Sequence, residues 1–89
     1  MPYITQTDRN MIEDLLATQG WTEKIATSPG QLNYLITKLV QIHMGTPSYA
    51  RINEVVGVLE AVKLELYRRM AAPYEDKKLK ENGDVYEYL

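Results

Sequence analysis

One long stretch decides the fold: residues 48–72 read SYARINEVVGVLEAVKLELYRRMAA. Ser48 can cap the start of a helix, because its side-chain oxygen accepts a free amide hydrogen of the first turn. No strong stop signal occurs before Pro73, whose ring and missing N–H disfavour continuation of a helix. The stretch therefore predicts a helix over 49–72. At 1.5 Å per residue this helix would be roughly 36 Å long, which is longer than a compact chain of 89 residues needs.

Apolar side chains lie on two sides of this predicted helix. With successive residues about 100° apart, one broad arc is apolar throughout and should form the core of a helical hairpin. It holds Ile52, Val55, Val56, Leu59, Val62, Leu66 and Met70. A second strip consists of small residues, Ala50, Gly57 and Ala61, with Leu64 on its flank.

The small-residue strip predicts a contact between subunits. Gly57 costs the helix about 1 kcal/mol relative to alanine, and the close approach of another backbone would offset that cost. We expect Ala50, Gly57, Ala61 and Leu64 to form the interface of a homo-oligomer, most simply a two-fold dimer. A flat ligand lying on the strip and a tolerated glycine with no special role are the alternatives.

A second helix is predicted over 29–44. Ser28-Pro29-Gly30-Gln31 combines a capping serine, proline at the first helical position and a glutamine that completes a capping box. Gly45 should end the helix, since glycine readily adopts a left-handed conformation. The loop to the next helix is short, so the two helices should form an antiparallel hairpin.

The two ends of the chain are less regular. A short first helix is predicted over 8–19, capped by Thr7 or Asp8. Gly20 should stop it, and residues 20–28 form a connection with Trp21 and Ile25 as apolar anchors. Segment 74–89 is mostly charged but ends in apolar and aromatic residues. We expect this acidic, tyrosine-rich segment to dock on the helices or on a neighbouring subunit, with a frayed terminus as the alternative.

Composition fits one all-α domain over residues 1–89, with a net charge of −2. The absence of cysteine excludes disulfides, thiolate metal sites and a cysteine nucleophile, and fits a cytoplasmic protein. No apolar run is long enough for a membrane span and no signal peptide opens the chain, so we expect no membrane partner. We do not expect nucleic acid to be a partner, because a chain with a net negative charge lacks the basic surface that holds a phosphate backbone.

Several polar and aromatic residues could bind a small anionic ligand. Arginine and lysine would neutralise phosphate, asparagine would donate hydrogen bonds, and tyrosine would stack on a base. The candidates are Asn33, Tyr34, Lys38, Tyr49, Arg51, Asn53, Arg68 and Tyr74. The alternative is structural: arginines near a helix end complement its dipole, and a buried asparagine often fixes the register of helices.

Catalytic and metal-binding patterns are missing. His43 is the only histidine, and no cysteine or clustered carboxylates accompany it. There is no glycine-rich phosphate loop and no serine elbow. We therefore expect a protein that is not an enzyme and that uses no metal or cofactor.

The same stretch carries a resemblance. SYARINEVVGVLE at 48–60, KLELYRR at 63–69 and PYEDKKLKENGDVY at 73–86 resemble a small family of uncharacterised helical proteins from phages and bacteria. Residues 1–4 and 32–37 match it as well. The resemblance implies a phage or prophage setting, and hence the cytoplasm of a bacterial host, but no established activity. In architecture alone, residues 30–44 and 48–72 are similar to the helical-hairpin proteins with which phages sequester immune signalling nucleotides.

These observations favour a non-catalytic, homo-oligomeric binding protein. Its leading function would be a phage counter-defence sponge that holds a small anionic, nucleotide-like signal between subunits. The alternative is an interaction module, an adaptor or inhibitor that docks on a host or phage protein through its tyrosine-rich tail and exposed helix faces. Nucleic-acid binding ranks behind both.

Overall fold

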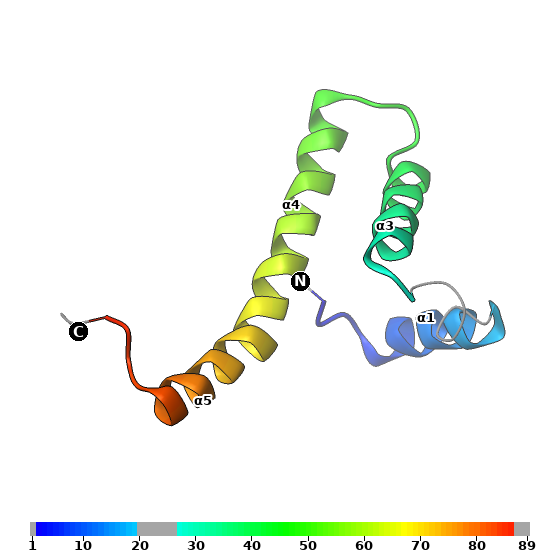
Figure 1. Cartoon of the computed structure of the whole chain (residues 1–89). Coiled ribbons are helices and arrows are strands. Elements are labelled where there is room, and N and C mark those ends of the chain that lie inside the picture. The colour runs from blue at the N-terminus through cyan, green and yellow to red at the C-terminus, as the bar shows by residue number, and fades with distance from the viewer. Residues whose placement is uncertain (1, 20–26, 87–89) are drawn as a thin grey trace. The chain divides into compact units, whose positions relative to one another are not determined.

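The computed structural model describes residues 2–19 and 27–86, and within these ranges it is helical with no strand. Figure 1 shows the elements, which are α1 (Gln6–Gln19), α3 (Pro29–Met44), α4 (Tyr49–Leu66), the π-helix η1 (Tyr67–Ala71) and α5 (Ala72–Asn82). The all-α fold class is thereby confirmed. The expectations for Gly20, Trp21 and Ile25, and for the last three residues, fall outside the described residues.

Helix α1 begins earlier than predicted because Thr5 provides its cap. The Asp8 amide donates a hydrogen bond to the Thr5 hydroxyl at 3.2 Å, so Thr7 and Asp8 lie inside the helix rather than at its cap. Arg9 holds the segment that precedes the helix. Its Nε donates to the Ile4 carbonyl at 2.9 Å, and its guanidinium lies 6.0 Å from the centre of the Tyr3 ring.

Helix α3 has the bounds that its sequence signals predict. Ser28 is extended (φ −136°, ψ 157°), and its hydroxyl accepts a hydrogen bond from the Gln31 amide at 3.2 Å. The Gln31 side chain in turn accepts from the Thr27 amide at 2.9 Å, one residue earlier than in a standard capping box. At the other end Gly45 has φ 63°, a conformation that favours glycine, and its N–H donates to the Gln41 carbonyl. Local capping chemistry therefore fixes this helix.

The third predicted helix is longer than expected because Pro73 does not end it. Helical structure continues from Tyr49 through η1 to Asn82, an uninterrupted run of 34 residues (Figure 1). In an α-helix the proline ring would clash with the carbonyl four residues earlier. In η1 the chain widens instead, and the Ala72 N–H donates to the Tyr67 carbonyl, five residues back. The π-helix thus accommodates Pro73, and residues 74–82 of the acidic segment are helical.

The hydrophobic core is almost absent from the described residues. The chain consists of two units, residues 1–56 and 57–89, and α4 runs through their boundary. Val55 is the one buried apolar residue described, with 6% of its surface exposed. The arc expected to form the hairpin core is otherwise open: Leu59 is 40% exposed, Ile52 45% and Val56 58%. The helical pattern was predicted correctly, but most side chains on this face are exposed among the described residues.

A substitution of Pro73 tests whether η1 relieves the cost of proline within the helical run. Pro73→Ala should raise the free energy of unfolding by about 1–3 kcal/mol, because proline inside a helix costs about 3 kcal/mol relative to alanine and the π-turn recovers only part of it. Thermal unfolding followed by circular dichroism measures the change. Pro47→Ala, in the loop before α4, is the matched control and should not stabilise the protein. A melting temperature for Pro73→Ala at or below that of the wild type would contradict this account.

Candidate functional site

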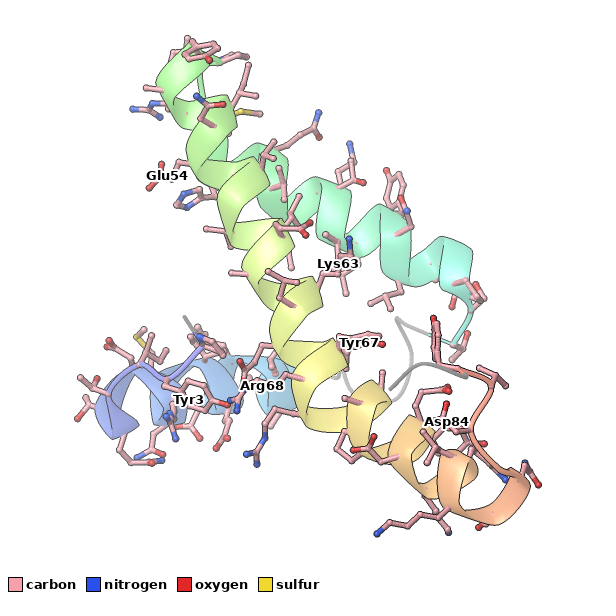
Figure 2. All side chains as sticks on the ribbon, turned by 90° about the vertical axis from the view of Figure 1, so that its left-hand side faces the viewer. Tyr3, Glu54, Lys63, Tyr67, Arg68 and Asp84 are labelled. Atoms are coloured by element: carbon pink, nitrogen blue, oxygen red, sulfur yellow. The ribbon has the colours of Figure 1, made fainter. Side chains whose placement is uncertain are left out.

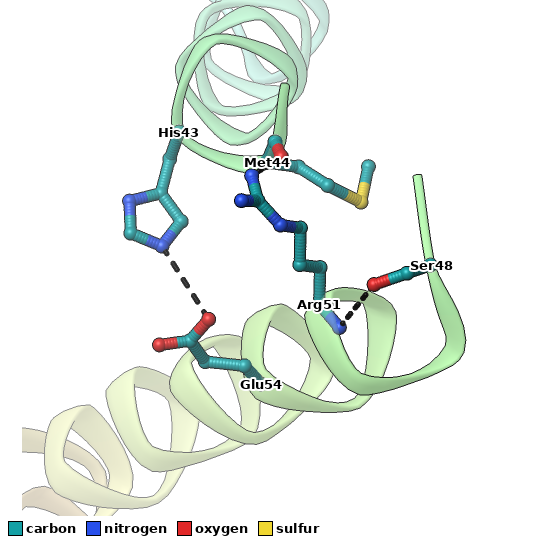
Figure 3. Close-up of polar contacts among 5 residues, drawn as sticks. All are labelled: His43, Met44, Ser48, Arg51 and Glu54. Carbon is teal, nitrogen blue, oxygen red and sulfur yellow. Dashed lines mark hydrogen bonds and ion pairs between the residues drawn. The ribbon is translucent and has the colours of Figure 1, made fainter. Parts of the chain in front are cut away.

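The corner between α3 and α4 is held by polar contacts (Figure 3). Ser48 caps α4, since its hydroxyl accepts a hydrogen bond from the Arg51 amide at 3.2 Å. The Arg51 guanidinium reaches back and donates through Nη1 to the Met44 carbonyl at 2.6 Å. Carbonyls in the last turn of a helix have no partner within it, and a charged donor satisfies one of them. Arg51, a predicted phosphate ligand, therefore serves the hairpin corner.

A second polar contact lies on the other side of this corner. His43 Nε2 lies 3.9 Å from Glu54 Oε2, and the two side chains point toward each other across the corner (Figure 3). Both side chains are more than 60% exposed, so the pair adds little stability.

Helix α3 brings two of the predicted ligand residues together. The Lys38 ammonium lies 5.3 Å from the centre of the Tyr34 ring, a cation–π distance, and donates to the Gln41 side chain at 3.3 Å. Asn33 precedes them, and its carbonyl accepts from the Thr37 hydroxyl. Asn33 and Tyr34 lie roughly 15–17 Å along the helix from its end at Met44, so they are remote from the corner.

The remaining candidates occupy separate places. Tyr49 and Asn53 lie on the first turns of α4, and Tyr49 is 82% exposed. Arg68, in η1, donates to the Glu65 carboxylate at 2.7 Å. Tyr74, in α5, has the Lys78 ammonium 5.6 Å from its ring centre. The predicted ligand-binding residues therefore contact near neighbours in the sequence, and neither unit brings all of its candidates together in one site.

The predicted interface strip lies on α4. Ala50 and Leu64 are exposed and Ala61 is half-buried. A Cβ placed on Gly57 would meet no atom within 4 Å among the described residues. The described residues therefore leave room for a Cβ at position 57, so they do not explain why glycine is there.

A groove that sequence analysis missed lies in the second unit. It has a volume of about 610 Å³ and runs between one face of η1 and α5 and the segment after α5. Gly83, at φ 91°, ends α5, and the chain then turns back beside the helix, as the position of Asp84 in Figure 2 shows. The lining residues are Tyr67, Ala71, Glu75, Asp76, Lys78, Leu79, Asn82, Gly83, Asp84, Val85 and Tyr86. The sequence did contain a signal for this groove. A turn at Asn82-Gly83 is followed by the apolar and aromatic residues Val85 and Tyr86.

Within residues 2–19 and 27–86 no helix is both long and apolar enough to cross a membrane. The same residues contain no group of three or more His, Cys, Asp or Glu side chains placed to hold a metal ion.

The sequence model of one protein family matches residues 1–85. The chain belongs to this family, a domain of unknown function called DUF6899. The DUF6899 match takes in every described helix and the groove lining through Val85. The resemblance to an uncharacterised family is thereby confirmed. No curated protein and no solved structure gave a match.

The corner of this DUF6899 chain offers a direct test of Arg51. Arg51→Ala should lower the free energy of unfolding by about 1–2 kcal/mol, because it leaves the Met44 carbonyl without its charged donor. Urea unfolding at matched protein concentrations measures the change. Arg69→Ala is the control, since the described residues offer the Arg69 side chain no hydrogen bond or ion pair. Equal stability of the two variants would show that Arg51 does not hold the corner.

Proposed function

We propose that this DUF6899 protein is a non-catalytic, self-associating interaction module that works through its exposed helix faces. The burial of Val55 alone among the described apolar residues is the observation that carries the proposal. A chain of 89 residues needs a buried apolar core to offset the entropy lost on folding. A second copy of the chain supplies the missing cover.

The apolar side chains that α4 leaves open are large ones. Ile52 is 45% exposed, and Val56 and Leu64 are each 58% exposed. Removing such side chains from water is the main favourable contribution to the association of proteins.

The pattern of α4 supports the same proposal. Exposed apolar side chains occur on opposite sides of the helix, with Ile52, Val56 and Leu59 on one side and Leu64 beside Gly57 on the other. A helix with apolar residues on two sides needs a covering surface on each of them. We place the closest contact between copies at Ala50, Gly57, Ala61 and Leu64, where small side chains allow two backbones to approach.

Substitution of Gly57 tests this interface. Light scattering should give the wild type a mass that is a multiple of 10.3 kDa and should give Gly57→Leu a lower mass. Because a Cβ on Gly57 meets no atom of the described residues within 4 Å, we would attribute a loss of association to a clash with another copy. Gly30→Leu, in the first turn of α3, is the matched control and should keep the wild-type mass. A Gly57→Leu mass equal to that of the wild type would refute the interface.

A small anionic ligand held between subunits is the second candidate. The Tyr34–Lys38 pair favours it, because an exposed ring beside an ammonium group can receive a base and its phosphate. In this proposal the protein is a phage-encoded sponge that acts in the cytoplasm of a bacterial host. Arg51 and Arg68 already have partners, and for this reason we rank the interaction module first. For that module, the partner would be a host or phage protein.

A melting screen separates the two functions. Cyclic nucleotides and ADP-ribose derivatives at micromolar concentration should leave the melting temperature of an interaction module unchanged. A sponge should gain several degrees, because its ligand binds only the folded state. Lys38→Ala should abolish any gain, and Lys77→Ala, an exposed lysine of α5, is the control. A gain that depends on Lys38 would reverse our ranking.

A further inference from the structure

The groove of the second unit is lined by apolar and aromatic residues. Leu79, Ala71 and Tyr67 belong to the helical run, and Val85 and Tyr86 belong to the segment that turns back. Figure 2 shows Tyr67 and Asp84 on these two elements. The apolar lining is open to solvent: Leu79 is 45% exposed, and the two tyrosines are at least half exposed. The groove therefore presents apolar and aromatic surface that a ligand can cover.

The charge of the groove is negative. Its lining carries three carboxylates, Glu75, Asp76 and Asp84, and one ammonium group, Lys78. The Lys78 ammonium lies 3.3 Å from Glu81 outside the lining, so it is already engaged with a different carboxylate. Asp84 keeps a fixed position, because its Oδ1 accepts a hydrogen bond from the Tyr86 amide at 2.8 Å. The carboxylates of the lining outnumber the cations of the lining, and an anionic ligand would be repelled.

We propose that this groove binds a basic, amphipathic segment of a partner protein, in which arginine or lysine alternates with apolar residues. Long basic side chains lay their aliphatic stems on apolar surface and keep the charged head at the rim. Leu79 and Val85 would receive the stems and apolar residues, the tyrosine rings would receive guanidinium groups, and the carboxylates would accept charged hydrogen bonds.

The size of the groove sets the length of that segment. The helix face from Tyr67 to Asn82 spans roughly 22 Å at 1.5 Å per residue, which equals about seven residues of extended chain. In an extended segment alternate side chains point to opposite sides, so a regular alternation presents arginine on one side and an apolar residue on the other. A second copy of this chain is a poorer occupant, because each copy carries a net charge of −2 and an acidic last segment.

This inference rests on the proposed interaction-module function, because it names the partner class of that module. Its test uses the full chain and a fluorescent peptide of about seven residues in which arginine alternates with leucine. A matched peptide has glutamate in place of arginine. Fluorescence anisotropy should show binding of the arginine peptide, weakening as salt rises, and at least about tenfold weaker binding of the glutamate peptide.

Neutral variants locate the binding. The groove variant combines Glu75→Gln, Asp76→Asn and Asp84→Asn. It should bind the arginine peptide at least about tenfold more weakly than the wild type does. The Asp84→Asn change keeps an oxygen that accepts the hydrogen bond from the Tyr86 amide. The control combines Asp8→Asn, Glu13→Gln and Asp14→Asn in α1, which changes the net charge equally, and it should bind within about twofold of the wild type. Circular dichroism confirms that both variants are helical.

The outcomes are distinct. The groove proposal is overturned if the two peptides bind equally well, or if the groove variant binds the arginine peptide as the wild type does. It is also overturned if the α1 control loses as much binding as the groove variant. Light scattering of the same samples reports association separately. An intact oligomer that fails to bind the peptide therefore overturns the groove alone, and a monomer that binds it overturns self-association alone.

Discussion

The described part of this chain contains more apolar side chains than it can cover. Helix α4 carries them on opposite faces, and Val55 is the one that the described residues bury. Isolated helices gain little stability from propensity alone, and packing of an apolar face normally stabilises them. We therefore propose that the helical run of 34 residues depends on a surface outside the described residues. The caps, the corner and the π-helix shape the run, but none of them replaces that burial.

The corner and the groove have different physical roles. At the corner, Arg51 and Ser48 satisfy backbone groups at two helix ends, so they determine where one helix stops and the next starts. The groove instead leaves apolar and charged groups open to solvent, and Glu75 and Asp84 are among them. Apolar surface left in water costs stability, so the groove is the better candidate for function, whereas satisfied groups such as Arg51 hold the fold.

Local chemistry explains what the sequence could predict. Ser28 and Gly45 bound α3 because their interactions lie within a few residues of each helix end. Pro73 misled the prediction because the cost of proline in an α-helix can be relieved by a π-turn, which no composition rule reveals. Helical periodicity placed Leu59 and its apolar neighbours on one face of the helix, but periodicity does not say what covers that face. The groove was missed because it depends on how the chain turns back at Gly83.

The most direct measurement is the helicity of the chain as a function of its association state. Sedimentation equilibrium and circular dichroism at the same concentrations, from about 100 µM downward, provide both quantities. The account predicts a mass that is a multiple of 10.3 kDa wherever the helices are intact, with helicity falling as the mass approaches that of one chain. Full helicity in a protein of 10.3 kDa at every concentration would contradict it.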